Sequence, residues 1–398
     1  MTHGCFTALV TIVEAGTIIE AKSFYNHSTT MQFTKTGELG EGTFATVYRV
    51  KRNQQQYPQL TACGTAERYY ALKLYKHNPQ KHNTLHTVAR EITAMKLLQN
   101  HPHIMSLMEV VKRGPNILPG LLMPLRDHTM CQSNFNQKLR SLEPADRLLV
   151  VKQLLKQLLQ AVAHCHRHGV MHRDIKPGNI MLTRMRMATT PPAYSVQAKT
   201  LKTPPPRLES LNPFVAPTHP PRAPRSLTPK PLTETPYLLE LTDFGLCYLC
   251  HGNSQSSRPQ CIDPLVVTVW YRPPELLLHH PHYGFEIDVW SVGCVFAELV
   301  RGAPLFAGIS AIGTLFQIFQ VMGSPHALPP GSRVRTFYES LTHFKSTFPK
   351  WSPESKVSLE AFVPELKDAG LDLLKRMLAL HPQDRCTAEE ALQHPFFR

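Results

Sequence analysis

Long hydrophobic runs are missing from this 398-residue sequence. No stretch of about twenty apolar residues occurs, which excludes a transmembrane helix of ordinary length. The short apolar segment 8–13 has no basic start and is soon followed by Glu14 and Glu20, so we do not expect a secretory signal. These absences predict a protein that works inside the cell, in the cytoplasm, the nucleus or both, and not at a membrane.

Acidic residues and cysteines are also scarce. There are 29 aspartates and glutamates against 43 lysines and arginines, which gives a net charge of +14. Such a balance attracts anionic partners but does not choose among nucleic acid, acidic peptides, lipids and nucleotide phosphates. The nine cysteines are scattered along a long chain, which excludes a dense disulfide framework and favours a reducing compartment.

Proline is abundant but unevenly spread. The segment 184–236 is rich in proline, threonine and basic residues and has almost no periodic apolar pattern, which predicts a disordered insertion that is partly polyproline-like. Its four Thr-Pro pairs are either phosphorylation or docking sites, or chance pairs in a solvated linker, and we favour the second interpretation. Because its basic residues lie in an aromatic-poor segment, we do not expect nucleic-acid binding.

The remaining pattern separates a strand-rich beginning from a helix-rich end. Strand-like runs occur at 46–50, 69–74 and 117–123. Helical spacing over 87–98 predicts a helix that starts near residue 84, and the apolar periodicity of 148–168 predicts a long amphipathic helix. From residue 238 onward the pattern is largely helical, so the chain combines a sheet with a larger helical part.

A glycine-rich turn lies between the first strands. Gly40, Glu41, Gly42 and Thr43 have the composition of a turn whose backbone N–H groups can approach phosphate oxygens closely. A plain hairpin would have a similar composition, so this signal is weak on its own.

A lysine follows soon after, at the end of an apolar strand. Lys73 requires a buried anionic partner unless it is an exposed edge residue, and for an isolated lysine the exposed position is the better interpretation. ATP phosphates would provide such a partner, and Glu91 on the following helix would hold the ammonium group.

The most informative cluster is the segment 172–179 together with Asp243, which lies beyond the proline-rich insertion. Asp174 can orient a substrate hydroxyl and accept its proton, and Lys176 can neutralise charge on a transferring phosphoryl group. Asn179 and Asp243 offer the oxygen ligands that Mg²⁺ prefers. Phosphoryl transfer depends mainly on positioning and charge neutralisation, and this set provides both.

In this order, the motifs resemble those of eukaryotic protein kinases from about residue 33 to the end of the chain. The third glycine of the usual loop is Ala45 here, and Lys176 is typical of the serine/threonine class. The resemblance implies an α+β bilobal fold that uses ATP and Mg²⁺. Its expected parts are an N-terminal extension at 1–32, then a kinase domain at 33–398 with a small antiparallel-sheet lobe at 33–123, a hinge at 124–128 and a large, mostly helical lobe at 129–398.

The resemblance also assigns site residues. It places the ATP-binding residues at Gly40, Glu41, Gly42, Thr43, Val47, Ala71, Lys73, Met123 and Leu125. It places the catalytic residues at Lys73, Glu91, Asp174, Lys176 and Thr268, and the metal ligands at Asn179 and Asp243. A pseudokinase scaffold is the alternative function, but it would predict the loss of Lys73, Asp174 or Asp243, and all three are present.

Two segments, 267–272 and 310–325, are similar to the CMGC group, which contains the cyclin-dependent and mitogen-activated kinases. In that group Arg272 would occupy the carbonyl of Val267 and so remove the acceptor for the N–H that follows the phosphorylated residue. Proline has no such N–H, which predicts Ser-Pro and Thr-Pro sites in protein substrates. The helix before Glu91 matches the cyclin-binding helix only loosely, so support for a cyclin-like activator is weak.

The activation segment departs from the group's pattern. It has no Thr-x-Tyr pair, and Asp263 stands where the activating threonine is usual. Of the three arginines that normally bind the phosphate, Arg90 and Arg173 are present and the third position is Tyr248. We hypothesise that Asp263 orders the segment without phosphorylation; the alternative is a solvated loop residue, and both remain open.

Two further features of this region are predicted. Glu275, at the end of the segment, should pair with Arg385. Cys247, Cys250, His251 and Cys261 have a spacing that could bind zinc, but ordinary activation-segment residues are the better interpretation.

Overall fold

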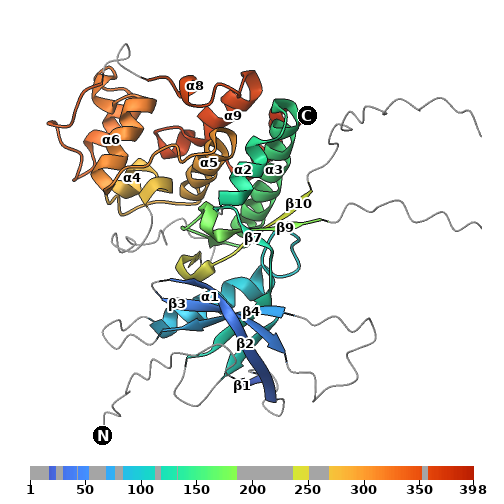
Figure 1. Ribbon diagram of the computed structural model, residues 1–398. Helices are drawn as coiled ribbons and strands as arrows, with labels where there is room; N and C mark the ends of the chain where they lie inside the picture. The colour runs from blue at the N-terminus through green and yellow to red at the C-terminus, as the bar shows by residue number, and fades with distance from the viewer. Residues whose placement is uncertain are drawn as a thin grey trace, which may run out of the picture.

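The computed structural model describes residues 18–23, 30–42, 44–52, 69–76, 84–112, 118–131, 133–185, 236–250, 269–351 and 357–398. They form a strand-rich lobe and a larger helical lobe (Figure 1), joined between strands β6 (Gly120–Pro124) and β7 (His128–Thr129). This is the two-lobed α+β fold that the sequence predicts. Nearly all of the proline-rich insertion lies outside the described residues.

The small lobe is an antiparallel sheet of six strands in the order β1-β2-β3-β4-β6-β5. The strands are β1 (Ile18–Ser23), β2 (Thr30–Glu41), β3 (Ala45–Arg52), β4 (Tyr69–Tyr75), β5 (Glu109–Lys112) and β6 (Gly120–Pro124). The three strands predicted from the sequence are confirmed as β3, β4 and β6.

Strand β1 closes this sheet into a barrel, because it pairs with both β2 and β5. Its Ile19 is buried beside Phe33, Val50 and Leu72 in a hydrophobic cluster on one side of the sheet. The strand precedes residue 33, where the sequence placed the start of the folded lobe. The sequence pattern does not predict this strand, because a six-residue segment carries little periodic signal of its own.

Helix α1 (Thr84–Leu97) packs on the other side of the sheet and begins at the residue where the sequence predicted it. Val88 and Met95 are buried in the main core and lie seven residues apart, on the same helix face. Glu91 lies between them on that face. The helix therefore presents Glu91 to strand β4 and the start of the large lobe.

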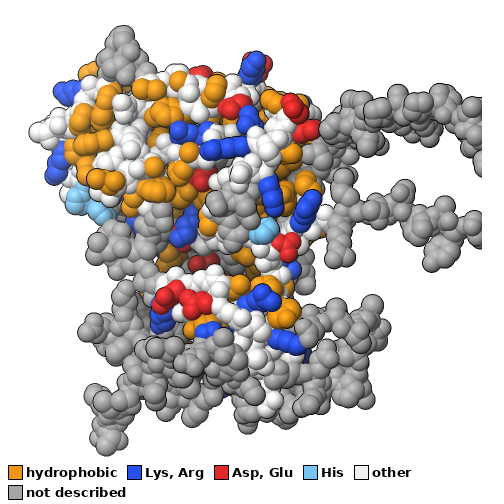
Figure 2. All heavy atoms as spheres, in the orientation of Figure 1, with side chains coloured by type: hydrophobic (Ala, Val, Ile, Leu, Met, Phe, Trp, Pro, Cys, Tyr) orange, Lys and Arg blue, Asp and Glu red, His pale blue; other side chains and the backbone are white. Residues whose placement is uncertain are grey.

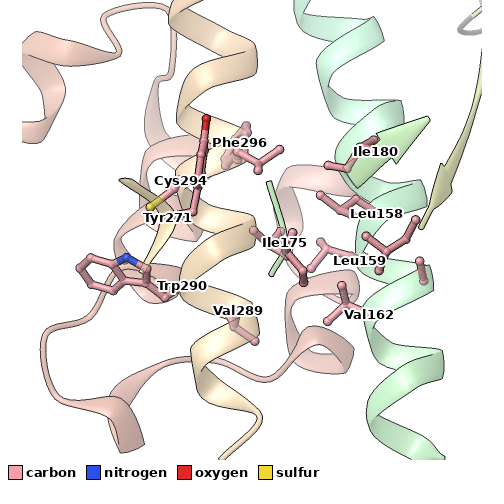
Figure 3. Packing of buried hydrophobic residues seen from close by; sticks show 14 of the residues in the cluster. Leu158, Leu159, Val162, Ile175, Ile180, Tyr271, Val289, Trp290, Cys294 and Phe296 are labelled. Carbon is pink, nitrogen blue, oxygen red and sulfur yellow. The ribbon is translucent and has the colours of Figure 1, made fainter. Parts of the chain in front are cut away.

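The large lobe is built around two long helices, α3 (Pro144–Arg167) and α5 (Glu286–Arg301). Figure 3 shows Leu158 and Val162 of α3 on one side and Val289 of α5 on the other, with Ile175 between the helices. Helix α3 begins four residues before the predicted start because proline is favourable in a first turn. Among the residues described, no helix is long and apolar enough to cross a membrane.

The other helices of the large lobe are shorter. They are α2 (Ser133–Arg140), α4 (Pro274–Leu277), α6 (Ala311–Met322), α7 (Arg333–Glu339), α8 (Leu359–Phe362), α9 (Asp368–Met377) and α10 (Ala388–Leu392). Single 3₁₀ turns are η3 (Pro177–Asn179), η4 (Phe244–Leu246), η5 (Val269–Tyr271), η6 (Pro325–Ala327), η8 (Pro382–Asp384) and η9 (Pro395–Phe397).

Short strands bring the two sides of the insertion together. They are β7 (His128–Thr129), β8 (Val170–Met171), β9 (Ile180–Arg184), β10 (Tyr237–Leu241) and β11 (Tyr248–Leu249). Strand β10 pairs antiparallel with β9, and the backbone N–H of Thr242 donates to the carbonyl of Asn179 at 3.0 Å. Residues 179 and 243 are therefore neighbours in space although about sixty residues separate them in the chain.

Candidate active site

A cleft of about 450 Å³ lies between the two lobes. Eight of the nine residues predicted to bind ATP line it, namely Gly40, Glu41, Gly42, Val47, Ala71, Lys73, Met123 and Leu125. The ninth, Thr43, lies outside the described residues. The strands of the small lobe form one apolar wall and Met181 of β9 contributes to the other, so the cleft can accept a flat apolar ring with its phosphates toward Lys73.

The glycine-rich turn joins β2 to β3 at the mouth of the cleft. The N–H of Gly42 donates to the carbonyl of Ala45 at 2.8 Å. Lys76, just after β4, donates to the carbonyl of Gly42 and pairs with Glu41 at 2.5 Å. Ala45, in place of the third glycine, is not among the residues with positive φ, so its side chain causes no backbone strain.

Lys73 lies at the centre of a buried charge network. Its Nζ is 2.7 and 3.0 Å from the two carboxylate oxygens of Glu91 and 2.8 Å from Oδ1 of Asp243. Burial alone would lower the pKa of Lys73, but the charges of Asp243 and Glu91 outweigh it and hold the pKa above its ordinary value. The ammonium group is therefore charged and fixed between the two lobes.

Glu91 is almost completely buried, with 1% of its surface exposed. Burial raises the pKa of Glu91 and the charge of Lys73 opposes this rise. The carboxylate has a second donor that the sequence did not reveal, the hydroxyl of Tyr75, which lies 2.6 Å from Oε2. The available signal was that Tyr75 follows Lys73 by two residues on a strand, so their side chains share a face.

Asp243 has a positive φ of 66° immediately before η4. Burial would raise the pKa of its carboxyl, but Lys73 lowers the pKa to about 2, so Asp243 is ionised at neutral pH. Gly245 follows where space is limited, because a Cβ there would lie 3.3 Å from oxygens of both Asp243 and Glu91. The tight turn aims the Asp243 carboxylate at the cleft.

Asp174, Lys176 and Asn179 form a second network across the cleft from the glycine turn. Lys176 Nζ lies 2.8 Å from Oδ2 of Asp174, and the amide nitrogen of Asn179 donates to the same oxygen at 2.8 Å. Burial raises the pKa of Asp174 while Lys176 opposes the rise. A carboxylate with a raised pKa and two fixed neighbours is suited to accept a proton.

Asp288 on helix α5 binds the backbone of the loop that carries Asp174, a contact that the sequence did not predict. Its carboxylate accepts hydrogen bonds from the backbone N–H groups of His172 and Arg173, each at 2.8 Å. Arg173 has a positive φ of 68°, which costs free energy in a non-glycine residue and is stabilised by these bonds. Asp288 therefore positions the backbone that carries Asp174.

Around the activation segment, Glu275 and Arg385 form a closed pair. Two nitrogens of Arg385 lie 2.6 and 2.8 Å from the two oxygens of Glu275, and both side chains are buried. Arg272 is largely buried. Its predicted partner Val267 lies outside the described residues, so the contact between them stays a prediction. The structure thus brings Glu275 and Arg385 together as the sequence predicted.

Arg90 and Arg173 approach each other at the junction of the lobes. Burial and the nearby charge of Arg173 lower the pKa of Arg90. Tyr248, in the third position of the expected arginine set, lies with its ring centroid 5.7 Å from the Arg173 guanidinium. Asp263 and Thr268 lie outside the described residues, so their predicted roles stay predictions.

Of the four residues considered as zinc ligands, Cys247 and Cys250 lie within the described residues. Cys247 is buried, and burial raises the pKa of its thiol to about 12. His251 and Cys261 lie outside the described residues. Within the part of the chain that the structure describes, no group of three or more metal-binding side chains is found.

Comparison with known proteins agrees with this geometry. The protein kinase domain family matches residues 33–190 and 231–397. The chain is also 30% identical over 370 residues to cyclin-dependent kinase B2-2 of Arabidopsis thaliana, with 92% of each chain covered. The chain therefore belongs to the protein kinase family, and within it to the cyclin-dependent kinase-like serine/threonine kinases of the CMGC group.

Proposed function

We propose that this protein uses the cleft to transfer the γ-phosphate of ATP to serine and threonine hydroxyls of other proteins. One observation carries the proposal: the network of Lys73, Glu91 and Asp243 and the network of Asp174, Lys176 and Asn179 line the same cleft. The first set suits a nucleotide triphosphate and the second suits an incoming hydroxyl.

The residues present fit Mg²⁺ and ATP. Asp243 is ionised and reaches into the cleft, and the amide nitrogen of Asn179 is engaged by Asp174, which leaves the amide oxygen to meet a cation. Proteins usually bind Mg²⁺ through one or two oxygen-bearing side chains, and phosphate oxygens and water complete the coordination. When bound, Mg²⁺ neutralises charge on the phosphate oxygens.

The chain's own side chains would act as follows. Lys73, fixed by Glu91, would bind the phosphates of the nucleotide. The adenine would lie against the hinge at 124–126, with Met123 at the back of the pocket. Asp174 orients the substrate hydroxyl and accepts its proton, and Lys176 offsets the charge that develops on the transferred group. Thr268 is proposed to steady Asp174 and Lys176.

We further infer that the substrates are Ser-Pro and Thr-Pro sites and that the protein acts in the cytoplasm or nucleus. The buried position of Arg272 in a chain of the CMGC group supports the first inference. A cyclin-like activator at α1 is a weaker inference from the named relative. Nucleic acid is not proposed as a partner, because the basic residues of 184–236 lie in an aromatic-poor stretch of sequence. On the face shown in Figure 2, basic side chains lie in small groups among acidic and hydrophobic ones.

The test is a γ-phosphate transfer assay on a proline-directed peptide. Asp174→Ala and Lys73→Met are each expected to lower kcat by about a hundredfold or more, because the first removes the proton acceptor and the second removes the charge that positions the phosphates. Lys112→Met, an exposed lysine on β5, is the matched control and should behave as wild type. A wild-type protein that binds ATP but transfers no phosphate to any peptide would favour the scaffold alternative.

The same assay on a peptide library tests the sequence preference. We expect peptides with proline after the phosphorylated residue to be favoured, and Arg272→Ala to reduce that preference. Equal rates for proline and alanine at this position in the wild-type protein would contradict the inference about Ser-Pro and Thr-Pro sites.

A further inference from the structure

Tyr75 is the last residue of β4 and follows Lys73 by two positions. Alternate residues of a strand point to the same face, so both side chains leave β4 toward α1. There they contact one carboxylate: Tyr75 donates its hydroxyl to Glu91 at 2.6 Å, and Lys73 binds Glu91 at 2.7 and 3.0 Å. We propose that Tyr75 is a positioning residue that fixes Glu91 and, through Glu91, holds Lys73 against the nucleotide. The inference rests on the proposed kinase function.

The argument begins with how Lys73 is shared. Its ammonium group binds both Glu91 and Asp243, and in the proposed reaction it must also meet the phosphates of ATP. Each new partner weakens the hold of Lys73 on Glu91. A buried carboxylate that loses a donor is destabilised, because water cannot replace the lost hydrogen bond.

Tyr75 supplies a donor that does not have to move. Its ring belongs to the main hydrophobic core, as do Val88 and Met95 of α1, and only 6% of its surface is exposed. Burial and the nearby charge of Glu91 raise the pKa of Tyr75 well above its ordinary value, so the hydroxyl keeps its proton. Glu91 is therefore held from β4 by a rigid side chain while Lys73 changes partners.

The contact also ties α1 to the sheet. Lys73 alone would link strand and helix through a flexible side chain of four methylene groups. Tyr75 has only two rotatable side-chain bonds, and its ring is packed, so the strand–helix distance at Glu91 is fixed more tightly. Lys73 also lies 5.4 Å from the centroid of the Tyr75 ring, which restricts the lysine in turn.

The first test is Tyr75→Phe, which keeps the ring and removes the hydroxyl. We expect the KM for ATP to rise about tenfold, as for the loss of a hydrogen bond to a charged group. The KM for the peptide substrate should stay at the wild-type value. Tyr70→Phe is the matched control, because Tyr70 lies on the same strand but packs against the other cluster of the small lobe. Equal changes in both KM values would indicate general damage and would overturn the inference.

The second test separates the contact from any loss of stability. Affinity for Mg·ATP is measured by calorimetry, without peptide, for the wild type, Tyr75→Phe, Glu91→Gln and the double variant. If Tyr75 acts through Glu91, Tyr75→Phe weakens binding in the wild-type background and has little further effect in the Glu91→Gln background. Fully additive effects, or no effect of Tyr75→Phe on the wild type, would overturn the inference.

These results are distinguishable from failure of the proposed function. A wild-type protein that binds Mg·ATP but transfers no phosphate would refute the kinase reaction, while the binding comparison would still report on Tyr75. A fully active Tyr75→Phe variant with wild-type ATP affinity would refute only the role of Tyr75.

Discussion

Two arginine sites beside the activation segment differ in how their charge is balanced. Arg385 is enclosed and meets both oxygens of Glu275, whereas burial and then the like charge of Arg173 lower the pKa of Arg90. The first site is complete within the described residues. The second gathers positive charge and gains stability only when an anion is added to it. The difference separates a fixed part of the fold from a part that can respond to its surroundings.

Contacts around each site support this distinction. The Nε of Arg385 donates to the carbonyl of Ala379 at 2.9 Å, and its guanidinium lies 4.8 Å from the ring centroid of Trp290. Arg173 donates to the carbonyl of Leu246 at 2.7 Å, but the Nε of Arg90 has no hydrogen-bond partner among the described residues. A half-buried guanidinium whose inaccessible Nε keeps an unused donor is able to bind a further acceptor.

The largest expected effect comes from breaking the closed site. Glu275→Gln removes the negative charge and leaves the buried guanidinium of Arg385 without compensation. We expect the free energy of unfolding to fall by about 3–5 kcal/mol, the usual cost of half of a buried ion pair. Urea denaturation followed by circular dichroism measures this change.

The exposed pair of Arg333 and Asp384 is the matched control. Asp384→Asn should change the free energy of unfolding by no more than about 1 kcal/mol, since exposed pairs contribute little. If Glu275→Gln lowered the free energy of unfolding no more than Asp384→Asn does, the pair of Glu275 and Arg385 would not be a major source of stability.

A smaller effect is expected from the open site. Asp263 lies outside the described residues, and its carboxylate is the anion that we hypothesise for Arg90 and Arg173. Asp263→Asn should lower kcat about tenfold, which corresponds to about 1.4 kcal/mol. Asp263→Glu should retain more activity, and the measurement is peptide phosphorylation after phosphatase treatment. Complete loss of wild-type activity after that treatment would mean that the arginines require a phosphate.

The sequence predicted the residues that converge on the cleft, because their chemistry depends on residue type at fixed spacing. The sequence motifs are enough to indicate the chemical roles of four of these residues, namely Lys73, Glu91, Asp174 and Asn179. Asp243 lies close to these residues because strands β9 and β10, which flank the insertion, pair with each other. The predicted strands and helices were found within a few residues because their apolar periods were regular.

The contacts that the sequence did not predict involve residue types with many ordinary uses. Tyr75 is a strand tyrosine and Asp288 is a helix aspartate, and residue type and spacing do not tell which group each of them contacts. Strand β1 is only six residues long; it pairs mainly with the next strand, β2, and two of its residues also pair with β5, about ninety residues later. So short a segment carries little periodic signal of its own, and the pairing that closes the barrel has no local signal.

The same contrast between opposite and like charges extends to a histidine cluster. His101 stacks on His164 at a ring-centroid distance of 4.4 Å, and His164 lies 4.2 Å from His168. Burial, followed by the charges of these neighbours and of Arg167, lowers the pKa of His101 to about 4. Burial and the charges of His168 and Arg167 also lower the pKa of His164. His101 and His164 are therefore neutral in the folded protein at neutral pH.

The smallest expected effect is a change in how stability depends on pH. Below about pH 6.5 the unfolded chain binds protons that the folded cluster excludes, so the stability is fully present above that pH and is lost as the pH falls toward 4. His164→Leu removes one titrating group and one neighbour that repels protonated His101. We therefore expect the fall in Tm between pH 7.5 and pH 5 to be smaller in this variant than in wild type. His86→Leu, an exposed histidine on α1, should follow the wild-type curve. If Tm fell with pH equally in His164→Leu and wild type, the histidine cluster would not contribute to the pH dependence of stability. Only Arg90 and Arg173 would then contrast with the pair of Glu275 and Arg385.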